Sequence, residues 1–84
     1  MNKQEAFEQW SLLEMLIAGI ETQRDLARNR VTSDAIQLGR CRRREKSYYS
    51  MRMDQDTGEM IGLDKAAVLL KRKKREIERI LDND

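Results

Sequence analysis

Apolar side chains recur at alternating steps of three and four residues along the first third of the chain. This spacing is typical of one face of an α-helix. It predicts a first helix over about residues 2–30. Eight positions, all apolar except Arg24, share its stripe: Ala6, Trp10, Leu13, Ile17, Ile20, Arg24, Ala27 and Val31.

Further apolar residues fall beside or opposite this stripe, at Leu12, Met15, Leu16, Ala18 and Leu26. A helix that is apolar on almost every side needs neighbours on at least two faces. We therefore expect a homodimer or higher oligomer built around the first helix. Its self-association residues would be Trp10, Leu13, Leu16, Ile17 and Ile20. The alternative is that other helices of the same chain cover this helix.

The segment Val31–Asp34, in which three polar residues follow the valine, predicts a break after the first helix. Thr32 or Ser33 can serve as an N-cap, and Asp34 in a first turn suits the helix dipole. A second helix is expected over about residues 33–47, although Gly39 disfavours it.

The period changes from Tyr49, because Tyr49, Met51 and Met53 alternate with polar residues. Alternation with a period of two is typical of a strand, and residues 55–58 end in Gly58, a common turn residue. These features predict a turn or short β-hairpin over residues 49–62, with paired strands at 49–61. The alternative is that the second helix continues to Met53 and an acidic loop follows.

A third helix is predicted over about residues 64–82. Asp64 is a suitable N-cap, and Leu63 can pack on Val68 as a hydrophobic staple. Its apolar stripe holds Leu63, Ala66, Ala67, Leu70, Ile77 and Leu81, with Lys73 and Lys74 on or at the edge of it. The long stems of these lysines can lie along apolar surface. The predicted fold is all-α or mostly α: one domain over residues 1–84, a small dimeric helical bundle.

Composition supports a folded helical protein of limited core size. The 84 residues include 38% charged side chains and no proline, and the mean hydropathy is −0.82. Periodic apolar spacing argues against disorder, and a chain of this size forms only a marginal core by itself. No apolar run approaches the roughly 20 residues of a membrane span, and the acidic N-terminus does not suggest a secretory signal. We expect a cytoplasmic protein, or a nuclear one in a eukaryote.

Catalytic and metal chemistry find little support in the residues. The chain has no histidine, so histidine-based catalysis and histidine metal ligands are excluded. Asp54, Asp56 and Glu59 do not match a calcium loop, since Gly58 comes one position early and Lys65 stands where a glutamate is needed. Cys41, the single cysteine, is expected to be a buried and inert thiol. We expect no enzyme activity, no cofactor, no metal and no small-molecule substrate.

Charge is distributed in bands, although the net charge is only +2. Residues 40–53 hold six Lys or Arg against Glu45, residues 54–64 are acidic, and residues 65–79 are strongly basic. Bands of this kind attract polyanions or acidic proteins. The candidate nucleic-acid-binding residues are Arg40, Arg42, Arg43, Arg44, Lys46, Lys71, Arg72, Lys73, Lys74, Arg75 and Arg79, with Tyr48 and Tyr49 as rings able to stack on bases.

Two functions are compatible with these features. One is a small regulatory protein that binds DNA or RNA through both basic segments. The other is an adaptor or inhibitor that self-associates through the first helix and recognises an acidic or nucleic-acid-binding protein. A basic helix lying on a membrane surface is a weaker alternative, because the apolar side of residues 64–82 lacks bulky aromatic residues. Both basic bands are also compatible with a simple solvated surface.

Overall fold

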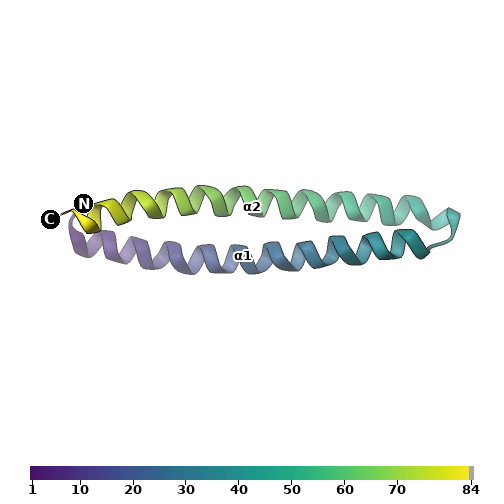
Figure 1. The fold of residues 1–84 in the computed structure, drawn as a ribbon, viewed down its shortest axis with the longest axis horizontal. Helices are drawn as coiled ribbons and strands as arrows, with labels where there is room; N and C mark the ends of the chain where they lie inside the picture. The colour runs from purple at the N-terminus through teal and green to yellow at the C-terminus, as the bar shows by residue number, and fades with distance from the viewer. Residues whose placement is uncertain (84) are drawn as a thin grey trace.

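The chain folds into two long antiparallel helices joined by a short tip. The computed structural model describes residues 1–83. Helix α1 spans Lys3–Arg40, a 3-10 turn η1 spans Arg43–Glu45, and helix α2 spans Lys46–Asp82. The two helices lie side by side over their whole length, so the molecule is a rod of 64 × 14 × 13 Å with both termini at one end (Figure 1). The all-α fold class is therefore confirmed.

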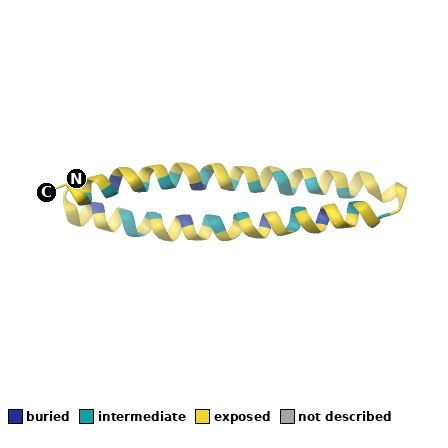
Figure 2. Cartoon of the chain, in the orientation of Figure 1, coloured by how far each residue is buried: buried dark blue, intermediate teal, exposed yellow. Residues whose placement is uncertain are grey.

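The two helices contact each other along a continuous seam, which we define as the inward-facing positions of both helices. On α1 the seam continues the predicted stripe beyond Val31, through Asp34 and Leu38. Its positions on α2 are Tyr49, Met53, Asp56, Met60, Leu63, Ala67, Leu70, Lys74, Ile77 and Leu81. Both sets alternate steps of three and four, the repeat of a coiled coil. Figure 2 shows that the buried and half-buried residues follow this seam and that the outer faces are exposed.

The start of α1 is capped by its own side chains. Asn2 is the N-cap, and its side-chain oxygen accepts a hydrogen bond from the Glu5 backbone N–H at 2.8 Å. The Glu5 carboxylate accepts in return from the Asn2 side-chain amide at 3.1 Å. Such reciprocal bonds satisfy donors that the first turn leaves unpaired. A carboxylate there also complements the positive end of the helix dipole.

The predicted break at Val31–Asp34 is wrong, because α1 runs through these residues without interruption. The Thr32 hydroxyl donates to the Arg28 carbonyl at 3.2 Å, four residues earlier, and does not cap a new helix. Asp34 is buried in the seam. The separate second helix at 33–47 is therefore not confirmed: its residues are divided between α1, the tip and α2.

The β-hairpin predicted at residues 49–61 is also wrong, since these residues lie within α2. Tyr49 and Met53 are four residues apart and both face the seam, so the alternation is equally compatible with a helix. No glycine in residues 1–83 has a positive φ, and Gly58 lies on the exposed side of α2. Asp64 is not an N-cap, because it lies inside the same helix.

Helix α2 covers one stripe of α1 and leaves other apolar residues of α1 exposed to solvent. Ile17 is buried in the seam, whereas Leu12, Met15, Leu16 and Leu26 are exposed. Neither helix in the described part of the chain is long and apolar enough to cross a membrane. The dimeric bundle expected from the sequence is not confirmed by this single-chain structure.

Candidate nucleic-acid interface

The connection between the helices, residues 40–46, forms the hairpin tip. Extended backbone at Cys41 and Arg42 ends α1, and η1 turns the chain into α2. The Cys41 N–H donates to the Gln37 carbonyl at 2.8 Å, and the Glu45 N–H donates to the Arg42 carbonyl at 2.9 Å. The tip is thus a short turn held by backbone hydrogen bonds.

Five cationic side chains converge on this tip: Arg40, Arg42, Arg43, Arg44 and Lys46. All five are exposed. Within residues 1–83 none of them forms an ion pair or a side-chain hydrogen bond. Glu45 is the only acid in the tip. The end of the rod opposite the termini therefore carries a positive charge that the fold does not neutralise.

The two tyrosines that follow the tip differ in exposure. Tyr48 is 53% exposed, whereas Tyr49 is half-buried in the seam. Their rings meet edge to face with centroids 5.1 Å apart, and Arg52 donates to the Tyr48 hydroxyl at 3.2 Å. Of the two predicted stacking rings, only Tyr48 presents most of its surface to solvent.

The second basic segment, residues 71–79, is partly neutralised by acids. Lys74 lies 2.7 Å from the Glu14 carboxylate, and Lys71 lies 3.4 Å from Glu21. Lys73 pairs with Glu76 on its own helix at 3.6 Å. The remaining cations of this segment, Arg72, Arg75 and Arg79, are exposed.

The structure does not bring the two basic segments together. Lys46 and Arg72 lie on the same helix, so at 1.5 Å per residue they are about 40 Å apart. The tip is consequently the denser and less compensated of the two candidate sites.

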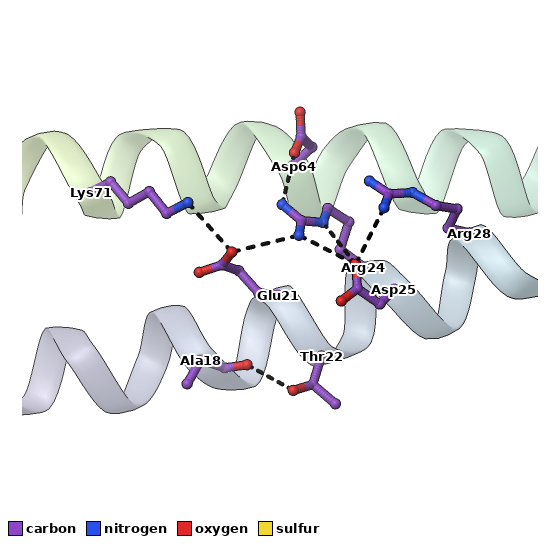
Figure 3. A network of polar contacts seen from close by, with 8 residues as sticks. All are labelled: Ala18, Glu21, Thr22, Arg24, Asp25, Arg28, Asp64 and Lys71. Atoms are coloured by element: carbon purple, nitrogen blue, oxygen red, sulfur yellow. Dashed lines mark hydrogen bonds and ion pairs between the residues drawn. The ribbon is translucent and has the colours of Figure 1, made fainter.

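A polar network crosses the middle of the seam (Figure 3). Arg24 occupies a seam position and contacts the carboxylates of Asp64 at 3.2 Å, Asp25 at 3.3 Å and Glu21 at 3.5 Å. Lys71 reaches Glu21 from α2. A charged residue at a seam position must find partners on the facing helix, so these pairs favour one alignment of α1 against α2.

A second polar cluster lies in the seam nearer the tip, where Asp34 and Asp56 meet. Asp34 is 4% exposed. Arg52 lies 3.5 Å from Asp34, and Arg30 lies 3.2 Å from Asp56. One oxygen of each carboxyl, Oδ2, is buried without a hydrogen-bond donor among the described residues. A proton taken up by one carboxyl would let it donate to the other.

The pKa values of the two carboxyls are shifted in opposite directions. The hydrogen bond to Asp56, together with burial and the Asp56 charge, raises the pKa of Asp34 above its ordinary value. The same hydrogen bond, aided by Arg30 and opposed by burial, lowers the pKa of Asp56. Asp34 is therefore the carboxyl of the pair that takes up a proton first as the pH falls.

Most of the predicted self-association residues pack within the chain. Ile17 is buried in the seam, and Trp10, Leu13 and Ile20 are half-buried there, whereas Leu16 is exposed. The Trp10 ring NH donates to Glu78 at 3.1 Å. The Lys74 ammonium lies 5.3 Å from the centroid of the same ring, a cation–π geometry. The alternative that another helix of the same chain covers this stripe thus holds for these four residues.

The sequence pattern predicts a seam position for some of the polar seam residues Asp34, Asp56 and Lys74 and not for others. Lys74 falls on the predicted apolar stripe, so its position signals a polar contact. The stripe of α1 also reaches Asp34 when it is extended by one step, but the predicted break concealed this. The sequence pattern places Asp56 in the predicted turn at residues 55–58. Its position in the seam depends on α1, the helix that it faces.

Metal and thiol chemistry gain no support from the described residues. Residues 1–83 contain no group of three or more Cys, Asp or Glu side chains arranged to hold a metal ion. Cys41 is a free, half-buried thiol whose sulfur lies 3.4 Å from the Leu38 carbonyl oxygen.

No protein-family model matches the chain, and no curated protein or solved structure is significantly similar to it.

Proposed function

We propose that the protein is a small, non-enzymatic regulator that binds nucleic acid through its hairpin tip. The observation that carries this proposal is the group of five exposed cations at residues 40–46 without an acidic partner. Cations that are not neutralised by the fold remain available to phosphates, and each contact formed releases counterions from the nucleic acid. The exposed ring of Tyr48 adds a surface on which an unpaired base can stack.

The outer cations of α2 extend the proposed interface. Arg72, Arg75 and Arg79 are exposed, whereas Lys71 and Lys74 are held by acids of α1. The hydrogen bond to Glu14, opposed by partial burial, raises the pKa of Lys74, which keeps this ammonium charged and engaged within the fold. We therefore assign α2 a secondary role in binding, and Lys71 and Lys74 a structural one.

The proposal includes a homodimer in the cytoplasm, or in the nucleus of a eukaryote. A dimer would present two tips to one polyanion, and two linked weak sites bind more tightly than either alone. Support for self-association comes from the apolar residues that α2 leaves exposed on α1.

The test compares two triple substitutions that remove the same charge from different places. Neutralising the tip with Arg42→Gln, Arg43→Gln and Arg44→Gln should weaken binding to labelled duplex DNA and single-stranded RNA at least tenfold at moderate salt. It should also reduce the slope of log K against log salt by about one per lost phosphate contact. The matched control is Arg72→Gln, Arg75→Gln and Arg79→Gln, for which we expect a smaller loss.

Fluorescence anisotropy at several salt concentrations measures both quantities. Equal losses in the two variants would contradict the assignment to the tip. Absence of salt-dependent binding by the wild-type protein would refute nucleic-acid binding altogether.

Docking on a protein partner is the second candidate function. The observation that favours it is a shallow apolar groove along one side of the hairpin, lined by Gln9, Leu12, Leu13, Leu16, Lys73 and Ile77. An acidic partner would use the cationic tip and this groove together. A stoichiometric complex that survives nuclease treatment and moderate salt would favour this function over nucleic-acid binding.

A further inference from the structure

One side of α1 exposes no charged residue over residues 9–29. The exposed charged residues of this stretch, Glu14, Asp25 and Arg28, lie on the other side of α1. Over residues 9–29 the remaining side, three positions of each seven-residue repeat, exposes Gln9, Leu12, Met15, Leu16, Gly19, Thr22, Gln23, Leu26 and Asn29. None of these is charged, in a chain with 38% charged residues. We name this surface the uncharged face of α1.

The corresponding outward face of α2 has the composition expected of a surface in water. Over residues 65–80 its exposed or half-buried outward positions include Lys65, Arg72, Lys73, Glu76 and Arg79. Residues 65–80 of α2 therefore do not share the absence of charge seen on this side of α1. Charged residues are depleted at the centre of protein–protein interfaces, whereas solvent-facing helix surfaces carry them.

The molecule exposes more surface than a compact monomer of the same mass, by an amount close to the size of one protein–protein interface. The described chain exposes 6436 Å² for a mass of 9.9 kDa. A compact monomeric protein of this mass is expected to expose about 5,200 Å², so the rod exposes about 1,200 Å² more. A standard protein–protein interface buries about 800 Å² on each partner, so one such contact removes most of the excess.

Leucines lie at equal distances on either side of Gly19 in the uncharged face, which allows two copies of this face to pair with each other. Leu12 and Leu26 lie seven residues before and after Gly19, and Leu16 and Thr22 lie three before and after it. When two copies of α1 cross in opposite directions with Gly19 at the centre, Leu12 of each copy meets Leu26 of the other. A two-fold interface requires such reciprocal pairing. An added Cβ at Gly19 would meet no atom within 4 Å inside the chain, so the surface at this glycine is open to close approach by another helix.

Charge selects the antiparallel orientation over the parallel one. A parallel pair would bring two tips of five unpaired cations side by side, and like charges repel. An antiparallel pair places the tips at opposite ends, about 65 Å apart at 1.5 Å per residue from Gly19. It also places Glu8 of one copy level with Arg30 of the other, because both lie eleven residues from Gly19.

We propose that a second copy of this chain occupies the uncharged face of α1, forming an antiparallel two-fold dimer centred on Gly19 with one basic tip at each end. This inference rests on the self-association included in the proposed function and not on nucleic-acid binding. The dimer is a four-helix assembly in which the α1 helices are inside and the α2 helices face solvent.

The first experiment measures the mass of the nuclease-treated protein by sedimentation equilibrium. The wild-type protein should have twice the monomer mass of 9.9 kDa. The double variant Leu12→Glu with Leu26→Glu should be monomeric while keeping its helical circular dichroism, because both side chains are exposed in the hairpin. The matched control is Val68→Glu with Leu69→Glu, two equally exposed apolar residues of α2, which should remain dimeric.

A monomeric wild-type protein at concentrations up to about 100 μM would overturn the proposal, since such a dimer would be too weak to form in a cell. Dissociation of the α2 control with retention of the α1 variant as a dimer would overturn it as well. Either result leaves nucleic-acid binding by the tip to be judged by its own assay, which uses variants outside α1's uncharged face.

The second experiment determines the orientation by disulfide cross-linking in a Cys41→Ser background. The Leu12→Cys and Leu26→Cys proteins should each stay unlinked when oxidised alone and form a linked pair when mixed. Efficient linking of each protein with itself would show a parallel dimer and overturn the antiparallel arrangement. Disulfide geometry permits this distinction, because bonded cysteines need Cα atoms within about 7 Å.

Discussion

The carboxyls of Asp34 and Asp56 acquire shifted pKa values because of the groups that surround them in the seam. Each would be an ordinary carboxylate on a solvated helix. In the hairpin the two face each other, with Arg30 and Arg52 at either side. The hydrogen bond that a protonated Asp34 donates to Asp56, together with burial and the Asp56 charge, raises the pKa of Asp34.

This pairing makes stability depend on pH in a defined direction. The pKa of Asp34 is raised on folding. Its contribution to the free energy of unfolding is therefore fully present below the ordinary aspartate pKa and is lost as the pH rises through the pKa of the folded state. We predict that Asp34→Asn, whose amide still donates to Asp56, is more stable than wild type at neutral pH. The advantage should shrink toward acid, where wild-type Asp34 takes up its proton.

Urea denaturation from about pH 4 to about pH 8 measures this dependence. Asp54→Asn is the control, since Asp54 is an exposed carboxylate of α2 two residues from Asp56. A stability difference between Asp34→Asn and wild type that does not vary with pH would argue against the shared proton.

At the scale of a helix, long-range packing overrides local signals. Thr32 and Gly58 are residues that often end helices, and both lie inside one here. Their local preferences are worth at most about 1 kcal/mol each. Two helices that pack along an uninterrupted repeat gain more by continuing, because each further turn buries seam residues.

The glycine within α2 offers a direct test of its helical continuity. Gly58 has no positive φ, and a Cβ added there would meet no atom within 4 Å. We predict that Gly58→Ala stabilises the protein by about 0.5–1 kcal/mol, because alanine loses less backbone entropy in a helix. Thermal denaturation monitored by circular dichroism measures the change.

The control for this prediction is the reverse substitution Ala35→Gly at an exposed position of α1, which should cost a similar amount. Destabilisation by Gly58→Ala would indicate that residues 55–58 form the turn suggested by their sequence.

At the scale of the whole molecule, the seam is unevenly apolar. The buried apolar residues Ala6, Ile17, Ala27, Ala67 and Ile77 lie toward the termini and the middle of the rod. Among the described residues nearer the tip, only Asp34 is buried, and the carboxyl pair occupies the seam there. The tip half therefore has less apolar burial to hold its helices together.

We predict that hydrogen exchange will be graded along the rod. Amides of residues 31–60 should exchange faster than those of residues 10–27 and 63–81, because local opening is easier where fewer apolar groups are buried. Exchange measured by NMR or mass spectrometry tests the gradient. The Ile77→Ala variant should speed exchange in the terminal half, since Ile77 is the largest fully buried side chain. Uniform protection along both helices would contradict the gradient.

The repeat of three and four residues was sufficient to predict helices, the α1 stripe and the position of Lys74 in an apolar face. These features depend on neighbours within one or two turns, so a single stretch of sequence contains them. The cationic tip was also visible, as five basic residues within residues 40–46.

Only the tertiary structure decided that two long helices replace the predicted long first helix, two shorter helices and a hairpin. It also decided which apolar residues of α1 are covered by α2 and which, such as Leu12 and Leu26, stay exposed. The physical reason is that continuity across Thr32 and Gly58, and the pairing of Asp34 with Asp56, gain their stability from a helix far away in the sequence. Local helix propensity depends only on neighbouring residues, so it carries no information about that distant helix.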